Sequence, residues 1–356
     1  MNKRLKKLRR TLAKKDLLPY LVSDLTNIRY LTGFTGSYAA LVIGGRDSFF
    51  LSDSRYEEYV RSILPRDVRF VLQKVDFCTT LEAELKTRGE SALYCEKHSM
   101  SLASFMDMKS KMKRIRLYPA EDVVNEQRMV KDGEEIALLR EAAAITDSCV
   151  NHLKSLIRPG MLEWDIAVEI EYFYRKRGCR RTSFDSIVAS GAGSSMPHYE
   201  TSMEKRIRPG DVLLIDMGCH YRGYNSDLTR TLFVNSIDPA VEKLYRVVQT
   251  AQQAALEAVR PGITTGKLDG VARNIIVREG YGQFFGHSLG HGLGLDIHEL
   301  PAVKAGDVKL RKNMVITIEP GIYLPGTGGV RIEDMVLVTG GGCEVLTKSS
   351  KDITIV

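Results

Sequence analysis

The amino-acid sequence predicts two domains of different class, an α/β domain in residues 1–122 and an α+β domain in residues 123–356. A length of 356 residues suits two domains. In the first part, short apolar runs alternate with helical patterns, which is typical of a layered α/β domain. In the second part, helical patterns accompany two apolar β-rich runs that each contain a turn, which indicates helices packed on antiparallel hairpins.

The first domain is predicted from short apolar runs with helical patterns between them. The predicted strands are residues 20–23, 39–43, 48–51, 69–72, 92–94 and 115–118, and the predicted helices lie near residues 2–15, 54–63, 76–88 and 100–111. This domain has no cluster of potential metal ligands, and we interpret its lone histidine, His98, as structural. We therefore expect the chemistry in the second domain.

The first fifteen residues are strongly basic and contribute to the net charge of +7. Leu5, Leu8 and Leu12 recur at helical spacing, which predicts a surface helix docked by its leucines. The basic residues are Lys3, Arg4, Lys6, Lys7, Arg9, Arg10, Lys14 and Lys15. A basic helix can also meet nucleic acid or an acidic surface. Because there is no zinc-finger spacing and no aromatic–basic interleaving, we expect no nucleic-acid partner.

The compartment is predicted from apolar runs and cysteines. No apolar run is long enough to cross a bilayer, and no apolar segment follows the charged N-terminus as it would in a secretory signal. Six cysteines are scattered without a CxxC pair, which favours reduced and mostly buried thiols. These patterns predict a cytoplasmic protein with no membrane partner.

The second domain follows a linker near residues 119–122 and opens with helical patterns. The predicted helices cover residues 131–156, 163–177, 238–259 and 265–279. In the second of them we interpret Trp164, Val168 and Phe173 as core packing. A helix, the tripeptide Arg-Pro-Gly and another helix occur in this order twice, which indicates an internal duplication.

Asp216 and Asp227 lie in the first β-rich run, residues 212–234, which is broken at residues 221–223. Folding the run about that break places the two aspartates opposite each other, within one residue. Opposed side chains share a face, with Cβ atoms roughly 5 Å apart. Two carboxylates at that distance repel each other, and a cation between them would remove the conflict.

Glu319 and Glu333 repeat this arrangement in the second β-rich run, residues 315–338, which is broken at residues 325–328. Folding about that break sets the two glutamates near each other. Each stands among isoleucines and valines, where an unpaired carboxylate is costly.

A histidine-rich segment, GHSLGHGLGLDIHE at residues 286–299, lies between the two runs and contains His287, His291 and His298. Oxygen ligands with one imidazole suit Mn²⁺, Co²⁺, Fe²⁺ or Zn²⁺ better than a soft ion that prefers thiolates. The four carboxylates carry the charge that neutralises two divalent ions. The pattern predicts a two-metal hydrolytic site, with ions about 3.5–4 Å apart that activate a bridging water. Any one of these acids could be a salt-bridged strand residue, but two pairs in apolar hairpins favour the metal site.

Four segments carry a resemblance to a known family: IDMGCHYRGYNSDLTRT, GHSLGHGLGLDIHE, TIEPGIYLPG and GVRIEDMV. They resemble the metal-binding segments of the metallopeptidases that include methionine aminopeptidase, aminopeptidase P and prolidase, which have the pita-bread fold. NIRYLTGFTGS at residues 27–37 is similar to the N-terminal domain of prolidase and creatinase-type proteins. The resemblance implies a creatinase/prolidase-type N-terminal domain, a pita-bread catalytic domain and a homodimer.

The resemblance also implies which side chains would hold the metal ions. Asp216 would hold one ion, Asp227 and Glu333 would bridge the two, and His291 and Glu319 would complete the shell of the other. Glu319 would also shuttle the proton to the leaving nitrogen. The implied cofactors are two divalent metal ions, Mn²⁺ or Co²⁺ in preference to Zn²⁺ or Fe²⁺.

Other residues would meet the substrate. His198, in the segment SMPHY, matches a substrate-contacting histidine of the proline-specific branch of the family. With His298 it would donate to the carbonyl oxygen and the tetrahedral intermediate. His287 would line the pocket for proline. Arg331 could orient Glu333, meet a substrate carboxylate, or form a salt bridge with a neighbouring acid.

The N-terminal domain and the SMPHY histidine favour the proline-specific branch over methionine aminopeptidase. The implied function is an Xaa-Pro dipeptidase, or prolidase, acting on short proline-containing peptides. The alternative is aminopeptidase P, which acts on longer peptides, because some prolidases carry an arginine just after HE-x-P and here HELP is followed by Ala302. A metal-free creatinase-like amidinohydrolase and a non-catalytic binding protein of this fold are less favoured, because all five ligand positions are retained.

Overall fold

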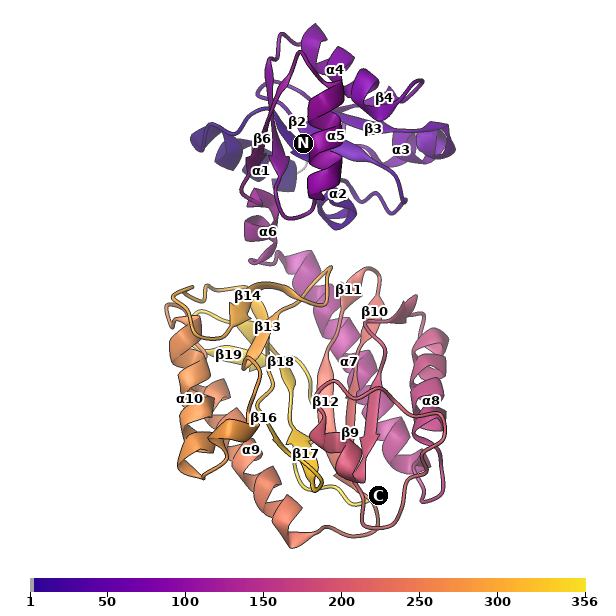
Figure 1. The fold of residues 1–356 in the computed structure, drawn as a ribbon, viewed down its shortest axis with the longest axis vertical. Coiled ribbons are helices and arrows are strands. Elements are labelled where there is room, and N and C mark those ends of the chain that lie inside the picture. The colour runs from indigo at the N-terminus through magenta and orange to yellow at the C-terminus, as the bar shows by residue number, and fades with distance from the viewer. Residues whose placement is uncertain (1–2) are drawn as a thin grey trace. The chain divides into compact units, whose positions relative to one another are not determined.

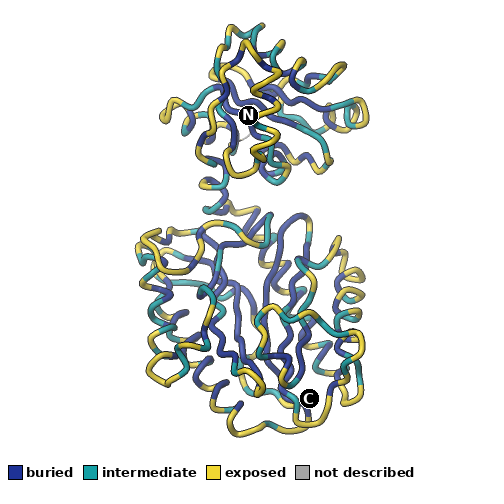
Figure 2. Tube along the Cα trace, viewed as in Figure 1, coloured by how far each residue is buried: buried dark blue, intermediate teal, exposed yellow. Residues whose placement is uncertain are grey.

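The structure, a computed structural model, describes residues 3–356, and the predicted start of the first helix at Asn2 lies outside them. The chain divides into two compact units, residues 1–128 and residues 129–356 (Figure 1). Within each unit the strands are largely buried and the helices expose their outer faces (Figure 2). No helix within residues 3–356 has the length and apolar character needed to span a membrane.

The short helix α6 (Val123–Arg128) belongs to the first unit, so the division falls after Arg128 and not after residue 122. Gln127 Nε2 donates to the carbonyl oxygen of Arg4 at 3.1 Å, and Arg128 Nη1 donates to Asn27 Oδ1 at 2.8 Å. These bonds tie α6 to the N-terminal helices, an attachment that the local composition around the linker does not reveal.

The first unit contains a six-stranded mixed sheet in the order β4-β3-β2-β1-β5-β6, in which β2 is antiparallel to β1 and β3 and the other neighbours are parallel. The strands are β1 (Tyr20–Val22), β2 (Ala40–Ile43), β3 (Ser48–Ser52), β4 (Val68–Leu72), β5 (Ala92–Glu96) and β6 (Arg116–Ala120). The helices before α6 are α1 (Lys3–Lys14), α2 (Leu25–Thr32), α3 (Glu57–Ile63), α4 (Phe77–Thr87) and α5 (Leu102–Lys111). Helices α2 and α6 were not predicted from the sequence.

Helix α1 buries the three leucines of its apolar face, Leu5, Leu8 and Leu12, as the sequence predicts. Helices α4 and α5 share a hydrophobic core with the sheet through residues such as Leu81, Met108 and Phe49. The predicted α/β class of this domain is therefore confirmed.

The second unit packs four helices on antiparallel sheets. The helices are α7 (Gly133–Leu156), α8 (Glu163–Lys176), α9 (Pro239–Ala258) and α10 (Thr265–Arg278). The strands are β7 (Arg181–Thr182), β8 (Ile187–Ser190), β9 (Val212–Met217), β10 (Cys219–Tyr221), β11 (Tyr224–Asn225), β12 (Leu228–Phe233), β13 (Gly290–Gly292), β14 (Glu299–Val303), β15 (Val315–Ile318), β16 (Gly321–Leu324), β17 (Gly328–Arg331), β18 (Asp334–Val338) and β19 (Cys343–Val345). The sheet orders are β12-β9-β8, β11-β10-β7, β14-β13-β15-β18-β19 and β16-β17.

Two hydrophobic cores divide this unit into similar halves. One core packs α7 and α8 on β9 and β12, and the other packs α9 and α10 on β15 and β18. Each half therefore consists of two helices against a hairpin, as Figure 1 shows. This arrangement supports the internal duplication that the repeated helix pattern indicates.

The interpretation of Trp164 and Val168 as core residues is wrong. Their side chains on α8 are 44% and 52% exposed, and the buried row of the helix is Ile166, Ile170 and Tyr174. Both rows are apolar and both follow the four-residue spacing of a helix, so periodicity alone could not choose between them.

Candidate metal centre

The first hairpin brings Asp216 and Asp227 to one face, but in a different register from the one predicted. Strand β9 pairs with β12 so that Asp216 lies opposite Thr229, and β10 and β11 continue this register to a two-residue turn. The turn residues Arg222 and Gly223 both have positive φ, 49° and 101°, as in the type I′ turn of tight hairpins. Asp227 is therefore diagonal to Asp216. Side chains alternate with a period of two, so a two-residue difference in register keeps both on the same face.

Two glycines allow the backbone to close up around the site. Gly218 falls opposite Asp227 in the hairpin register, and a Cβ there would lie 1.9 Å from the carbonyl oxygen of Ser226. A Cβ on Gly290 would lie 2.1 Å from the carbonyl oxygen of Thr317. Any larger residue at either position would push apart strands that carry candidate ligands.

The second hairpin sets Glu319 opposite Glu333, as predicted. Strand β15 pairs with β18 so that Ile318 lies opposite Asp334, and β16 and β17 continue the same register to the turn. The two glutamates occupy the position between these ladders. Opposed side chains share a face, so both carboxylates point the same way.

His291 meets the acids from β13. Its Nε2 lies 3.5 Å from Asp227 Oδ2 and 3.3 Å from Glu319 Oε1. Its Nδ1 lies 3.0 Å from the carbonyl oxygen of Gly292. A carbonyl oxygen only accepts, so Nδ1 carries the hydrogen, and Nε2 of the neutral ring directs its lone pair toward the acids. A histidine held in this way is oriented for metal binding through Nε2.

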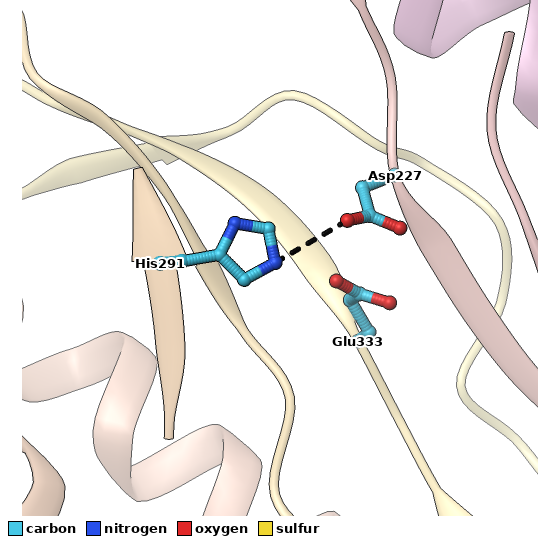
Figure 3. Close-up of side chains that lie close together, drawn as sticks. All are labelled: Asp227, His291 and Glu333. Carbon is cyan, nitrogen blue, oxygen red and sulfur yellow. Dashed lines mark ion pairs between the residues drawn. The ribbon is translucent and has the colours of Figure 1, made fainter. Parts of the chain in front are cut away.

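Asp227, His291 and Glu333 each offer a ligand atom, and these atoms all lie within 4.8 Å of one another. Figure 3 shows the imidazole and the two carboxylates directed toward a common point. Asp227 and Glu333 are 4% and 1% exposed, so the carboxylates are almost removed from water.

The electrostatics of this cluster favour positive charge. Burial raises the pKa of Asp227 to about 6 and that of Glu319 to about 7, and repulsion from neighbouring acids, including Asp216, adds to it. Burial and the other acids raise the pKa of Glu333 well above its usual value. Burial lowers the pKa of His291, but Asp227 and Glu319 outweigh it and leave that pKa raised to about 9.

Three of the carboxylates each keep one buried oxygen without a hydrogen-bond donor: Asp216 Oδ1, Asp227 Oδ1 and Glu333 Oε1. In two of these carboxylates the other oxygen accepts a hydrogen bond. Arg331 Nη2 donates to Asp216 Oδ2 at 2.6 Å, and Thr229 Oγ1 donates to Glu333 Oε2 at 2.8 Å. A buried acceptor without a partner costs about 1–3 kcal/mol. Divalent cations would satisfy these oxygens, so the side chains fit the predicted ions.

Arg331 is 3% exposed and is bonded to the protein on every side. Besides its bond to Asp216, its Nε donates to Thr229 Oγ1 at 2.9 Å and its Nη1 donates to Tyr323 Oη at 2.7 Å. Of the roles that the sequence leaves open, this geometry shows the ion pair with a neighbouring acid, and an indirect link to Glu333 through Thr229. It does not present Arg331 to a substrate carboxylate.

His287 lies in an aromatic cluster beside the acids. Its ring centroid is 5.0 Å from that of Phe285 and 5.6 Å from that of Tyr323. Its Nδ1 donates to the carbonyl oxygen of Ser288 at 2.8 Å, so its Nε2 accepts from Tyr323 Oη at 2.9 Å. Burial, with the charge of Arg331, lowers the pKa of His287 to about 4. Both nitrogens are engaged, so His287 offers a ligand only its ring.

His298 and His198 are exposed side chains near the acids. The ring of His298 lies edge-on to that of His291, with centroids 4.4 Å apart. His198 follows Pro197, whose carbonyl oxygen accepts from Arg331 Nη1 at 3.4 Å. Exposed imidazoles at these positions can donate to a molecule that binds at the carboxylates.

The sequence reasoning missed two threonines that support the candidate ligands. Thr317 Oγ1 donates to Glu319 Oε1 at 3.0 Å, and Thr229 Oγ1 donates to Glu333. Thr317 stands two residues before Glu319, and Thr229 stands two residues after Asp227. The period of two along a strand places each threonine on the ligand face, and this signal could have identified both.

Comparisons with known proteins give consistent results over the whole chain. Residues 137–340 match the profile of metallopeptidase family M24, and residues 4–130 match that of the creatinase/prolidase N-terminal domain. An Xaa-Pro dipeptidase of Pyrococcus horikoshii is 37% identical, over 99% of this chain and 99% of that protein. The solved structure of an Xaa-Pro dipeptidase from Bacillus anthracis is 36% identical, with a TM-score of 0.96 over 99% of both chains. That of an X-Pro aminopeptidase from Thermotoga maritima is 35% identical, with a TM-score of 0.89 over 98% of this chain and 100% of that one.

Proposed function

The chain belongs to metallopeptidase family M24, and from this premise we propose that it is an Xaa-Pro dipeptidase that depends on two divalent metal ions. It combines a creatinase/prolidase-type N-terminal domain with a pita-bread catalytic domain. The observation that carries the proposal is the cluster of buried carboxylates around Nε2 of His291, three of whose oxygens have no donor. The dipeptidases that align with the whole chain support the substrate class.

The proposed ligands are five side chains carried by the two hairpins and β13, and the mutual proximity of Asp227, His291 and Glu333 supports the proposal. Asp216, Asp227, His291, Glu319 and Glu333 would hold the two ions. The free oxygens of three of these acids support this assignment. Mn²⁺ or Co²⁺ is proposed ahead of Zn²⁺ or Fe²⁺, and the dominance of carboxylate oxygens in the set supports Mn²⁺.

The ions, when bound, supply a water of lowered pKa and polarise the scissile carbonyl. Glu319 takes a proton at Oε2 and delivers it to the leaving nitrogen. Its other oxygen, Oε1, accepts a hydrogen bond from Thr317 Oγ1 at 3.0 Å, which fixes the orientation of the carboxylate. A proton carrier with one fixed oxygen keeps the other available for the reaction.

His198 and His298 bind the substrate carbonyl oxygen by donating N–H groups that also stabilise the tetrahedral intermediate. Their exposure beside the carboxylates supports this role. His287 lines the proline pocket with its ring, because its nitrogens are engaged by Ser288 and Tyr323. An Xaa-Pro bond has no N–H, so recognition of the ring must come from such apolar contact.

Arg331 acts on the ligands and not on the substrate. Its bond to Asp216 and its link to Glu333 through Thr229 support a role in orienting these two acids. Outer partners of metal ligands typically contribute 10- to 100-fold to metal affinity or activity.

Aminopeptidase P activity on longer peptides is the second candidate, and the position of Ala302 favours it. In the β13–β14 ladder Ala302 lies opposite His291, so its side chain projects on the same face as the imidazole. An arginine there could pair with the free carboxylate of a dipeptide, and an alanine cannot. A carboxylate directly after proline is therefore less strongly favoured in this chain.

A substrate panel tests the proposal. The metal-free protein is supplied with Mn²⁺, Co²⁺ or Zn²⁺, and kcat/KM is measured for Ala-Pro, Ala-Pro-Ala, Ala-Pro-amide and Met-Ala-Ser. We expect cleavage of Ala-Pro with weaker cleavage of the tripeptide, and none of Met-Ala-Ser. If the tripeptide and the amide are cut at least about tenfold better than Ala-Pro, which corresponds to about 1.4 kcal/mol, the enzyme is an aminopeptidase P.

Two further features belong to this proposal. We expect a homodimer, which sedimentation of the purified chain measures. We also expect a cytoplasmic location, because all six cysteines are free and five of them are buried.

A further inference from the structure

The segment that carries His198 converges on one buried carboxylate. This segment, residues 190–205, is called the His198 loop; it runs from the end of β8 toward β9. The carboxylate belongs to Glu163, the first residue of α8, which is 0% exposed. The candidate metal centre does not use Glu163, and no ligand role follows from its position.

Glu163 accepts hydrogen bonds from widely spaced positions of the His198 loop. Its Oε1 accepts from Ser190 N and Ser190 Oγ, both at 2.7 Å, and lies 3.1 Å from Lys205 Nζ. Its Oε2 accepts from Tyr199 Oη at 2.9 Å and from Ser202 N at 3.3 Å. One side chain therefore joins both ends and the middle of the loop.

Tyr199 transmits this anchoring to His198. It is the next residue in the chain, and its ring packs against a small core that includes Leu214 and Tyr323. On the other side of His198, the carbonyl oxygen of Pro197 accepts from Arg331. The exposed imidazole is thus held between two residues that are fixed by buried charged groups.

Helix capping does not account for Glu163. Acids in the first turn of a helix often stabilise the helix dipole. In α8 the capping bond comes from Asp165, whose Oδ2 accepts from Leu162 N at 2.9 Å. The Glu163 carboxylate instead turns away from its own helix and into the loop.

We propose that Glu163 is a positioning residue for hydrolysis, which holds the His198 loop so that His198 meets the substrate carbonyl oxygen. The inference rests on the proposed function only in the role given to His198. Loss of the anchor should misplace a group that acts in the transition state, so kcat should fall more than KM rises.

A double-mutant cycle tests the coupling. With Ala-Pro and the best ion, Glu163→Gln should lower kcat by about ten- to a hundredfold, no more than the about 10²–10³-fold expected for loss of a carbonyl donor. Tyr199→Phe, which removes one hydroxyl, should lower it about three- to tenfold by the same reasoning. In a His198→Ala background, both changes should alter kcat less than about twofold, because the group they position is absent. Equal losses in both backgrounds would show that Glu163 does not act through His198.

Asp165→Asn is the matched control, since it removes a carboxylate of the same helical turn without touching the loop. It should lower thermal stability and leave kcat within about twofold. Bound metal should be unchanged in all variants. A similar fall in kcat for Asp165→Asn would reduce Glu163 to a general stabilising role and overturn the proposal.

Hydrogen–deuterium exchange gives a measurement that is independent of activity. Amides of residues 190–205 should exchange faster in Glu163→Gln and in Tyr199→Phe than in the wild type, with α8 unchanged. If the wild type cuts no Xaa-Pro peptide, the proposed function fails and this measurement still tests the anchor. Unchanged exchange in the loop of a folded variant would overturn the positioning role, whatever the substrate.

Discussion

Glu333 and Asp334 are neighbours in the chain, yet they belong to two differently built regions. Both are buried, at 1% and 0% exposure. Asp334 accepts from Arg230 Nη2 at 2.7 Å, and from Gln252, Thr347 and Lys351 at 2.8 Å each. Glu333, on the opposite face, accepts from Thr229 and keeps Oε1 without a donor.

The pKa values of the two acids move in opposite directions. Burial opposes the charge of Asp334, but Arg230 and Lys351 outweigh it and lower the pKa of that acid. Burial raises the pKa of Glu333, and the neighbouring Asp227 and Glu319 raise it further. The difference teaches that burial alone does not mark a functional acid. What distinguishes Glu333 is a buried oxygen that the protein leaves unsatisfied and that a cation can take.

The largest expected effect is the loss of activity when a bridging acid is neutralised. Glu333→Gln and Asp227→Asn should each lower kcat/KM by well over the about 100-fold that marks loss of an outer partner of a metal ligand. Both should also lower the metal content, which elemental analysis of the dialysed protein measures. If either variant kept wild-type turnover and full metal loading, the substituted acid would not be a metal ligand. The contrast with the ion-paired Asp334 would then have no functional meaning.

In the metal-free protein, substitution of Asp334 and substitution of Glu333 should change the free energy of unfolding in opposite directions. Asp334→Asn leaves the buried Arg230 and the partly exposed Lys351 without their acid, and breaking a buried pair such as Arg230–Asp334 costs about 3–5 kcal/mol. Glu333→Gln removes one of several mutually repelling carboxylates and should raise the unfolding free energy. Urea denaturation after chelator treatment measures both, and a change of the same sign in the two variants would contradict the comparison.

His198 extends the comparison to a residue that should touch substrate and no ion. His198→Ala should lower kcat by about 10²–10³-fold, the scale of losing one donor to an oxyanion. Its metal content and thermal stability should match those of the wild type. Loss of metal from this variant would make His198 a ligand.

The smallest effect concerns specificity beside the metal centre. Ala302→Arg places a guanidinium opposite His291 and should favour Ala-Pro over Ala-Pro-amide by about ten- to a hundredfold, the equivalent of about 1.5–3 kcal/mol for a hydrogen bond to a charged group. Ala302→Met is the control, because it adds bulk without charge. An equal gain in preference for Ala-Pro in both variants would show that the side chain at position 302 does not bind the carboxylate of the dipeptide.

Sequence patterns predicted the hairpins and the candidate ligands because the acids interrupt apolar β-runs. They did not predict the register of the first hairpin, since the turn centre at Arg222 and Gly223 depends on two positive φ angles. They also assigned the wrong face of α8, where two apolar rows compete. The support from Thr229 and the anchor at Glu163 arise from contacts between distant segments, 104 residues apart for Thr229 and Glu333 and 36 for Glu163 and Tyr199. No local pattern encodes such contacts.

The candidate ligands are divided between the two halves of the catalytic domain, and this affects when the enzyme becomes active during its synthesis. Asp216 and Asp227 stand on the β9–β12 side, whereas His291, Glu319 and Glu333 stand on the β13–β18 side. During synthesis, a chain whose last strands have not yet folded has only Asp216 and Asp227 of the five candidate ligands in place. On the proposed assignment of the ligands, an unfinished molecule would have no peptidase activity. Once bound, the ions would link the two halves of the domain. Tighter metal binding would therefore raise the free energy of unfolding.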